Sequence, residues 1–366
     1  MPHDDAPGPS APSHDHGGHR GRPDTEHGGA ADPHDRGDTS RRAFLGALVA
    51  DAVAMPVHWY YDREALRRDY GPIAGYLAPK NPHPDSILWR SSYTPSGPKT
   101  DILREQAEYW GRRGVHYHQF LAAGDNTLNS LLAIELFETV GRDRDYDPVR
   151  WLDHYVGFMI APGRHRDTYV EEYHRHFFTN LGHDRKPISC GVRDVHIGGL
   201  APVPALVAAL GPRHHDLRRI VRVHVGLTHK DDEVLAAADA LARLLARVTR
   251  GDDLRQAMLE EASDWISAAK VAAWDRHPDD VVVGRLLSPA CYIEEAFPAA
   301  LFLAWRYAAD PAAGIFANAA VGGDNCGRGA VVGSLLAAAA PLPPRLLEGL
   351  RAGARVSDAS FSPGHR

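Results

Sequence analysis

The sequence predicts an all-α fold. Alanine-rich apolar stretches recur along the chain with the spacing of helices, and short segments rich in Gly, Pro and Asp separate them. The one convincing β-branched run, residues 281–283, is too short to anchor a sheet. A chain of 366 residues is long enough to bury a large core. We therefore expect a compact single-domain bundle of many helices over residues 41–355.

The two ends of the chain differ from this domain. Residues 1–40 are rich in Gly, Pro, Asp and His and contain almost no large apolar side chain, which predicts a disordered tail. Residues 356–366 are expected to form a flexible C-terminus. The tail histidines either bind metal ions adventitiously or are simply solvated: His3, His14, His16, His19, His27 and His34.

Composition excludes several classes of protein. The formal net charge is −6, so the basic surface of a nucleic-acid-binding protein is not expected. No apolar run reaches the roughly 18–20 residues of a membrane span. Three cysteines do not make a disulfide framework, which favours a reducing, cytoplasmic setting. Arg41-Arg42 and the apolar run after them resemble a twin-arginine export signal, but Asp51 interrupts that run, and the alternative is a first core helix.

The expected helices follow from apolar periodicity and from breakers such as Pro56. They span residues 42–54, 101–113, 128–140, 151–160, 168–178, 217–249, 254–273, 291–307, 312–320 and 330–340. Residues 70–96 carry many Pro, Gly and Ser residues and predict a long loop, and long loops within a domain are often functional.

The tripeptide Gly-Asp-Asn occurs twice, each time at the start of an expected helix. Gly124-Asp125-Asn126 precedes one helix, and residues 323–325 precede another and lead into Cys326. One interpretation is that the Asp or Asn of each turn serves only as a helix cap. The alternative is that the two turns, about two hundred residues apart, face each other across one site.

Other polar and aromatic residues are candidates for substrate binding. Trp59, Tyr60, His116, Tyr117 and His118 either stack on a base or sugar, or form a half-buried aromatic layer.

Gly198-Gly199 would let the backbone approach a diphosphate. His229 is expected within a long helix, where its role is either packing or catalysis. Arg328, one turn from Asp324, would neutralise that carboxylate or bind a substrate anion.

Three stretches resemble the ADP-ribosylglycohydrolase family, which includes dinitrogenase-reductase-activating glycohydrolase. Residues 46–54 are similar to its opening helix, Thr228-His229 to a landmark within the chain, and Gly322-Gly323-Asp324 to its closing motif. The order and spacing agree over residues 41–340. The resemblance implies an all-α domain with a cleft and two magnesium or manganese ions that bind ribose hydroxyls and activate water.

The expected site departs from the family pattern. The family's Thr-Asp-Asp reads Gly124-Asp125-Asn126, its Gly-Gly-Asp-Thr-Asp-Thr reads Gly-Gly-Asp-Asn-Cys-Gly from residue 322, and its glutamate after the first helix falls at His58. Asparagine can ligate a hard cation through its oxygen, whereas cysteine and histidine favour softer metals. We expect one Mg²⁺ or Mn²⁺ rather than two, with a softer metal or none as alternatives. The candidate ligands are Asp125, Asn126, Asp324, Asn325, Cys326 and His58.

Three functions remain open from the sequence. The first is hydrolysis of an ADP-ribosyl or related N- or O-ribosyl bond, with Asp125 and Asp324 as the catalytic pair, on an ADP-ribosylated protein or an ADP-ribose-like metabolite. The second is a non-hydrolytic module that binds ADP-ribose or a protein partner. The third is a repurposed enzyme in which Cys326 is the nucleophile or His58 the general base.

Overall fold

The computed structural model describes residues 33–361, with side chains from residue 39 onward. This part of the chain contains sixteen α-helices and six short 3-10 helices, with no strand and only three isolated β-bridges. The all-α prediction is confirmed. The α-helices are α1 Pro33–Ala54, α2 Arg63–Tyr70, α3 Leu128–Asp143, α4 Pro148–Ile160, α5 Glu172–Gly182, α6 Pro202–Leu210, α7 Leu217–Gly226, α8 Asp232–Val248, α9 Leu254–Glu261, α10 Ala268–Trp274, α11 Asp279–Val282, α12 Ile293–Arg306, α13 Pro311–Ala320, α14 Asn325–Ala339, α15 Pro344–Glu348 and α16 Gly353–Ser357. The 3-10 helices are η1 Met55–Val57, η2 Leu88–Arg90, η3 Pro98–Thr100, η4 Arg104–Tyr109, η5 Pro187–Ser189 and η6 Ile197–Leu200.

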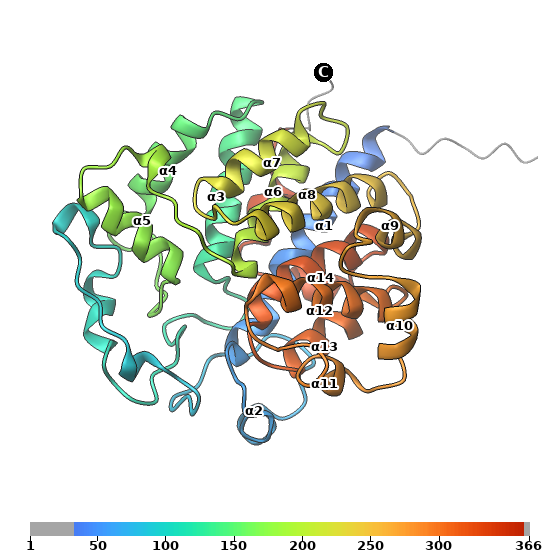
Figure 1. The fold of residues 1–366 in the computed structure, drawn as a ribbon, viewed down its shortest axis with the longest axis horizontal. Coiled ribbons are helices and arrows are strands. Elements are labelled where there is room, and N and C mark those ends of the chain that lie inside the picture. The colour runs from blue at the N-terminus through green and yellow to red at the C-terminus, as the bar shows by residue number, and fades with distance from the viewer. Residues whose placement is uncertain (1–32, 362–366) are drawn as a thin grey trace, which may run out of the picture. The chain divides into compact units, whose positions relative to one another are not determined.

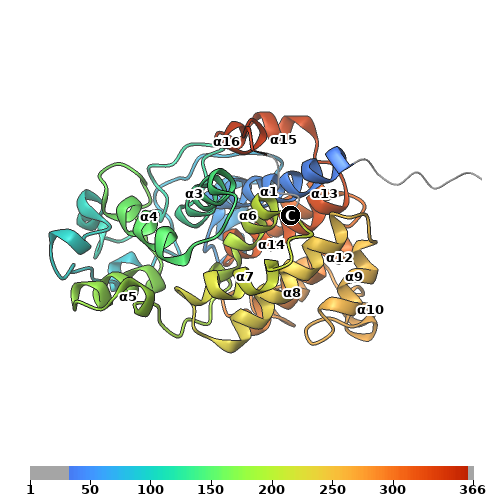
Figure 2. The same cartoon turned by 90° about the horizontal axis from the view of Figure 1, so that it is seen from above.

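Helices α1 and α14 pack against each other at the centre of the domain, and α6, α12 and α13 contact this pair (Figures 1 and 2). Small residues allow the close approach. A Cβ placed on Gly333 would lie 2.1 Å from the backbone oxygen of Gly46, which leaves no room for any side chain. The contact fixes the C-terminal end of α1 beside the N-terminal end of α14, and the candidate site lies there.

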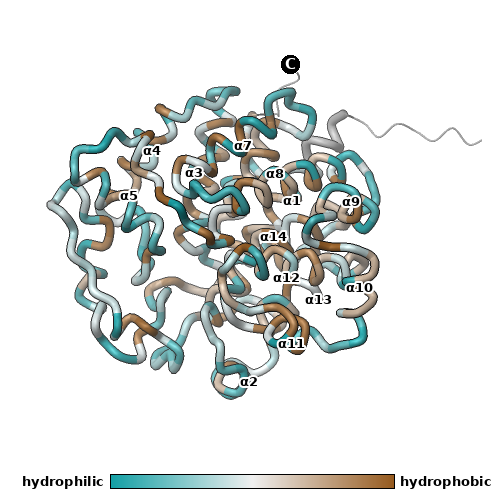
Figure 3. Tube along the Cα trace, viewed as in Figure 1, coloured by the Kyte–Doolittle hydropathy of each residue, from teal (hydrophilic) through white to brown (hydrophobic). Residues whose placement is uncertain are grey.

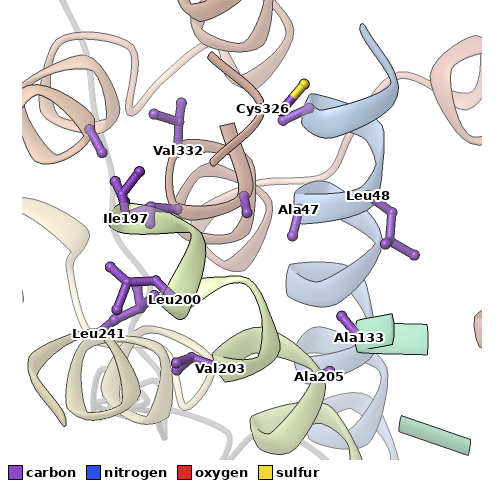
Figure 4. Packing of buried hydrophobic residues seen from close by; sticks show 14 of the residues in the cluster. Ala47, Leu48, Ala133, Ile197, Leu200, Val203, Ala205, Leu241, Cys326 and Val332 are labelled. Carbon is purple, nitrogen blue, oxygen red and sulfur yellow. The ribbon is translucent and has the colours of Figure 1, made fainter. Parts of the chain in front are cut away.

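Apolar side chains surround this central pair. Apolar segments gather around α14 and α12, whereas the outer loops are mostly hydrophilic (Figure 3). In close-up, Ala47 of α1, Val332 of α14 and Val203 of α6 belong to one buried cluster (Figure 4). Cys326 also belongs to it, at 4% exposure beside α1. The site is therefore built on the most buried helices of the domain.

Two long helical predictions are divided in the structure. The helix expected over residues 217–249 breaks between α7 and α8, so Thr228 and His229 lie in a turn rather than within a helix. Asp231 begins α8 by accepting hydrogen bonds from the backbone N–H groups of Glu233 and Val234. His229 also forms an isolated parallel bridge with Val192, so tertiary pairing overrides the helical periodicity here.

Similarly, residues 254–273 divide into α9 and α10, and residues 101–113 form only the 3-10 helix η4. Residues 279–282, which include most of the β-branched run, form the short helix α11.

The ends of the domain also differ from expectation. Helix α1 begins at Pro33, so residues 33–40 of the predicted tail are helical, while residues 1–32 lie outside the described part of the chain. At the other end, Phe361 packs on Phe137 with ring centroids 4.9 Å apart, and residues 362–366 lie outside the described part.

Arg42, from the segment similar to an export signal, is tied into the domain. Its Nε donates to the backbone oxygen of Ala337 at 2.7 Å, at the C-terminal end of α14, where carbonyl groups lack helical partners. None of the helices in residues 33–361 is both long and apolar enough to cross a membrane.

Candidate active site

A small cavity lies where α1 ends and α3 and α14 begin. Its volume is about 20 Å³, which is room for one water molecule. Its walls come from several segments far apart in the sequence. The lining residues are Asp51, His58, Trp59, His118, Thr127, Leu128, Asn129, Ser130, Asp167, Tyr169, Glu171, Ala201, Cys326, Gly327 and Ala330.

Two histidines and two aspartates form a continuous hydrogen-bonded chain at this cavity. His58 Nε2 lies 3.0 Å from Asp324 Oδ1, and His58 Nδ1 lies 2.7 Å from His118 Nε2. His118 Nδ1 lies 2.5 Å from Asp167 Oδ1. The backbone N–H of Leu128, at the start of α3, donates to the other oxygen of Asp167. All four residues are at most 3% exposed.

The glycine turn before α14 places Asp324 in this chain. Gly322 and Gly323 have φ values of 71° and 69°, which are costly for any other residue. A Cβ on Gly323 would also lie 2.0 Å from the backbone oxygen of Pro289. Asp324 itself accepts a hydrogen bond from the backbone N–H of Gly327 at 3.2 Å, so it is both the N-cap of α14 and a member of the site.

Glu171 and Asp324 have pKa values shifted in opposite directions. Burial, followed by the charges of Asp324 and Asp194, raises the pKa of Glu171 to about 8. Burial alone would raise the pKa of Asp324, but the hydrogen bond and charge of His58 lower it below its ordinary value. At neutral pH Glu171 is a carboxylic acid and Asp324 a carboxylate, which is how one site obtains both an acid and a base.

Neighbouring residues fix the position of the Glu171 carboxyl group. Its Oε1 accepts a hydrogen bond from Asn129 Nδ2 at 2.6 Å. A Cβ on Gly198 would lie 2.9 Å from Oε2, so the glycine leaves the space that this oxygen needs. Glu171 precedes α5, and this placement directs it toward the beginning of α3.

Asp51 joins α1 to the beginning of α3. Its carboxylate accepts hydrogen bonds from Asn126 Nδ2 at 2.9 Å, from the Thr127 backbone N–H at 2.9 Å and from Thr127 Oγ1 at 2.7 Å. Burial nevertheless raises the pKa of this carboxyl group. Asp51 lines the cavity but is bonded on both oxygens, which is typical of a structural carboxylate.

Trp59 lines the cavity in a strained backbone conformation. Its φ is 61°, which is rare for a bulky side chain and costs roughly 1–3 kcal/mol. The indole ring stacks on His58 with centroids 4.0 Å apart and meets Tyr169 edge to face at 4.8 Å. Such strain persists only where surrounding contacts hold it, and it is commonest at functional sites.

The structure brings together some of the predicted residues. His58, Trp59, His118 and Cys326 line the cavity, and Asp324 joins it through His58. Cys326, however, is deeply buried, and burial raises its thiol pKa well above the ordinary value. A thiol in this state is a poor nucleophile and a poor metal ligand.

Asp125 is not part of the cavity. Its carboxylate is paired with Arg166 Nη2 at 3.0 Å and lies 3.8 Å from Arg351 Nε, with the side chain 15% exposed. The two Gly-Asp-Asn turns therefore do not present their aspartates to one pocket. At the first turn, Thr127 is the residue that lines it.

The two predicted asparagine ligands serve as crosslinks. Asn126 Nδ2 donates to the backbone oxygen of Leu48 at 2.8 Å in addition to its bond with Asp51. Asn325 Nδ2 donates to the backbone oxygens of Val57 at 3.2 Å and Ala319 at 3.1 Å. Each ties the start of a helix to a neighbouring segment.

His116 and Arg328, both predicted to bind substrate, are completely enclosed. His116 Nε2 pairs with the backbone oxygen of Pro56 at 3.0 Å, and burial lowers its pKa well below the ordinary value, so it is neutral. Arg328 donates to the backbone oxygen of Gly322 at 2.7 Å and to Asn318 Oδ1 at 2.8 Å. Burial lowers its pKa to about 10, and no part of it reaches the cavity.

Gly198, Gly199 and His229 line a second cavity of about 50 Å³. It shares Asn129 and Ala201 with the first, so the two are neighbours. Burial lowers the pKa of His229 to about 4, so this ring is neutral.

The donors at the site do not fit the metal centre that the resemblance implies. Among residues 33–361, no three His, Cys, Asp or Glu side chains are arranged to hold a metal ion. Asp324 and Asp167 are each paired with a histidine, and both oxygens of Asp51 accept hydrogen bonds from protein donors. A hard dication favours anionic oxygen donors, and among the oxygens of these three carboxylates only Asp324 Oδ2 lacks a protein hydrogen bond.

Asp167 and Glu171 are the functional candidates that sequence reasoning missed. Both lie in the segment before α5, where the sequence predicted the helix to begin at residue 168. The local signal is two carboxylates within five residues, next to Thr168 and Tyr169. Nothing in that pattern indicates burial, which arises only when the segment packs against His118 and Asn129.

Comparison with known proteins agrees with the fold. The family model described as ADP-ribosylglycohydrolase matches residues 32–360. A solved structure described as an ADP-ribosylglycohydrolase-related protein complex is similar in fold, with a TM-score of 0.57 and 22% identity, over 88% of this chain and 95% of that one. No curated protein matches with comparable significance. The chain belongs to the ADP-ribosylglycohydrolase family, a family of hydrolases.

Proposed function

We propose that this protein hydrolyses the N- or O-ribosyl bond of an ADP-ribosyl group, with Glu171 as the general acid and Asp324 as the general base. One observation carries the proposal: Glu171, which lines the cavity, and Asp324, which is hydrogen-bonded to His58 in the cavity wall, have pKa values displaced in opposite directions. That arrangement supplies a proton donor and a proton acceptor at the same pH.

The reaction steps follow from the protonation states of the two carboxyl groups, with Glu171 protonated and Asp324 ionised. Glu171 donates its proton to the departing nitrogen or oxygen as the bond to the anomeric carbon breaks. Water forms the new bond to that carbon, and its proton passes to Asp324 Oδ2. The ionised Asp324 also stabilises the positive charge that develops on the ribose ring.

His58 and His118 position Asp324 in this scheme. Each ring nitrogen of His58 already has a partner, so neither is free to accept a proton from water. Their contribution is to hold the Asp324 carboxylate in place and ionised. The Gly327 backbone N–H bonds to Oδ1 as well, which leaves Oδ2 for the water.

The aromatic residues Trp59 and Tyr169 would bind the substrate. A cavity of about 20 Å³ does not hold a ribosyl group, so the site must widen when the substrate binds. Trp59 is a suitable moving part because its backbone is strained and its ring contacts mainly other rings. Its face would then stack on the sugar or base.

The test is release of ADP-ribose from arginine-linked and serine-linked ADP-ribosyl peptides and from a small N-riboside. Glu171→Gln and Asp324→Asn should each lower kcat about 100- to 10,000-fold, because each removes a proton-transfer group. Asp153→Asn, at an exposed position on α4, is the matched control. Wild-type turnover that survives both site substitutions would contradict the assignment.

Binding assays separate hydrolysis from recognition. If ADP-ribose binds to the wild-type chain but none of the three substrate classes is cleaved, the non-hydrolytic binding module predicted as an alternative describes this protein better. The relative kcat/KM values for the arginine, serine and N-riboside substrates identify the leaving group.

A further inference from the structure

A larger cavity lies outside the candidate active site, between helix α5 and the loop that precedes η3. Its volume is about 130 Å³, against about 20 Å³ for the active-site cavity, so it has room for a small ligand rather than one water molecule. Its walls come from residues 92–96, from the segment around η3 and from α5. The loop packs tightly on the end of α5, because a Cβ on Gly182 would lie 2.6 Å from Ser96 Cβ.

The lining of this cavity carries positive charge and no carboxylate. Arg175 and His176 are its basic side chains, and none of its eleven lining residues is acidic. His176 lies at the exposed rim, 3.5 Å from Glu172. Arg175 is half-buried, and within residues 33–361 no carboxylate lies at salt-bridge distance from it. The guanidinium charge at the cavity wall is therefore not neutralised by the protein.

Contacts with neighbouring groups hold the Arg175 guanidinium in place. Its Nε donates to the backbone oxygen of Val170 at 3.1 Å, and its Nη2 donates to the hydroxyl group of Tyr169 at 3.4 Å. The guanidinium carbon lies 5.1 Å from the ring centroid of Trp110. Nη1 has no hydrogen-bond partner in the part of the chain that the structure describes. A ligand would thus meet a positioned cation with one terminal nitrogen still free to donate.

Hydroxyl groups from the loop supply further donors. The side chains of Ser92, Thr94 and Ser96 line the cavity, and their hydroxyl groups have no protein partner among residues 33–361. Tyr93 differs, because its hydroxyl group is hydrogen-bonded to Asp101 Oδ1 at 3.2 Å and burial raises its pKa to about 12. A guanidinium surrounded by neutral hydroxyl donors is the combination that binds phosphate oxygens in proteins.

We propose that this cavity is a binding site for a phosphate group, which Arg175 neutralises and to which Ser92, Thr94 and Ser96 donate hydrogen bonds. Free inorganic phosphate and the phosphate of a nucleotide present the same chemistry to these donors. The proposal does not rest on the proposed hydrolysis, because the site lies outside the cavity that Glu171 lines.

Arg175 also links the phosphate site to the active-site cavity. The hydroxyl group to which it donates belongs to Tyr169, which lines that cavity and contacts Trp59 edge to face at 4.8 Å. A phosphate that draws the guanidinium toward itself weakens its hold on Tyr169. Occupancy of one site therefore changes the affinity of the other, and the effect is reciprocal.

The first test is equilibrium dialysis of the full chain against radiolabelled inorganic phosphate in a buffer without other oxyanions. We expect one saturable site per chain and at least tenfold weaker binding to Arg175→Gln, because a charge-assisted hydrogen bond is lost. Arg255→Gln is the matched control. Arg255 also donates through Nε to a backbone oxygen and lies over a tryptophan ring, that of Trp305, but it belongs to α9 and should leave phosphate binding unchanged.

A second variant and a spectroscopic signal keep the test decisive if Arg175→Gln does not fold. Thr94→Val removes one hydroxyl donor from an exposed loop position and should weaken binding about threefold or more. The indole N–H signal of Trp110, identified in NMR spectra with Trp110→Phe, should shift as phosphate is added to the wild-type chain, because Arg175 lies over this ring.

Three results would overturn the proposal. The first is the absence of saturable phosphate binding up to about 10 mM, a concentration at which even a weak specific site is occupied. The second is saturable binding that is unchanged in both Arg175→Gln and Thr94→Val. The third is a Trp110 signal that does not move while phosphate binds, since the anion would then lie elsewhere.

Dialysis in the presence of ADP-ribose identifies the source of the phosphate group. Displacement of phosphate by ADP-ribose, together with an ADP-ribose-dependent shift of the Trp110 signal, assigns the site to the phosphate of a nucleotide. Phosphate that binds without being displaced assigns it to the free anion. None of these measurements requires turnover, so the phosphate site and the proposed hydrolysis can fail separately.

Discussion

The raised pKa of Glu171 makes a quantitative prediction about stability. A carboxyl group whose pKa is higher in the folded than in the unfolded state binds its proton more tightly when folded. Folding therefore loses stability as the pH rises from the unfolded pKa, about 4.5, to the folded pKa, about 8. Glu171→Gln mimics the protonated acid at every pH and should remove this dependence.

The magnitude follows from the two pKa values. Between pH 5.5 and 7.5 unfolded Glu171 is ionised while folded Glu171 is mostly protonated, so each pH unit costs the wild-type chain about 1.4 kcal/mol. Across this window the difference in unfolding free energy between Glu171→Gln and wild type should change by up to about 2.5 kcal/mol in favour of the variant.

The assay is urea unfolding of both proteins at half-unit intervals from pH 5 to 9. Asp324→Asn provides a second check, because its charge contributes to the shift of Glu171 and its removal should reduce the pH dependence. A difference between Glu171→Gln and wild type that stays constant over this range would refute the raised pKa and, with it, the acid role of Glu171.

Three further predictions concern other parts of the chain. Gly333→Ala should destabilise the domain by roughly 1–3 kcal/mol, because the new Cβ meets the backbone of α1, whereas Gly75→Ala, with no atom within 4 Å, should be nearly neutral in the same urea unfolding assay. Iodoacetamide near neutral pH should label the partly exposed Cys291 before Cys326, whose buried thiol has a raised pKa, and peptide mass spectrometry will show the order. Asp125→Asn should change kcat by less than threefold, because this carboxylate pairs with arginines outside the cavity; a loss as large as that of the Asp324 variant would restore the two-turn site predicted from the sequence.

Local sequence was informative about which segments are helices. Apolar periodicity and caps act within one or two turns, so the ranges of α3, α4, α12 and α13 were predicted to within a few residues. The glycine-rich turn before α14 also pointed to Asp324, and both glycines of that turn have positive φ values, which favour glycine. The break between α7 and α8 was missed, since the bridge from Val192 to His229 joins residues far apart in the chain.

The resemblance of three short stretches was sufficient to predict the family, and the match over residues 32–360 confirms it. The contacts of the site residues, by contrast, were not predicted from the sequence. The sequence indicated that His58 stands where the family has a glutamate, but not that it is bonded to His118, sixty residues along the chain. Likewise, it paired Asp125 with Asp324 as catalytic residues, although only Asp324 contacts a residue of the cavity.

The sequence by itself therefore predicted most of the helices and the family, and it drew attention to Asp324, because these depend on patterns within a few consecutive residues. Tertiary structure alone decided that Asp125 lies outside the cavity, that Asp167 and Glu171 line it, and that His58 and His118 are hydrogen-bonded to each other. These are consequences of packing, because a side chain's partners and its pKa depend on atoms supplied by distant segments and on how completely they exclude water.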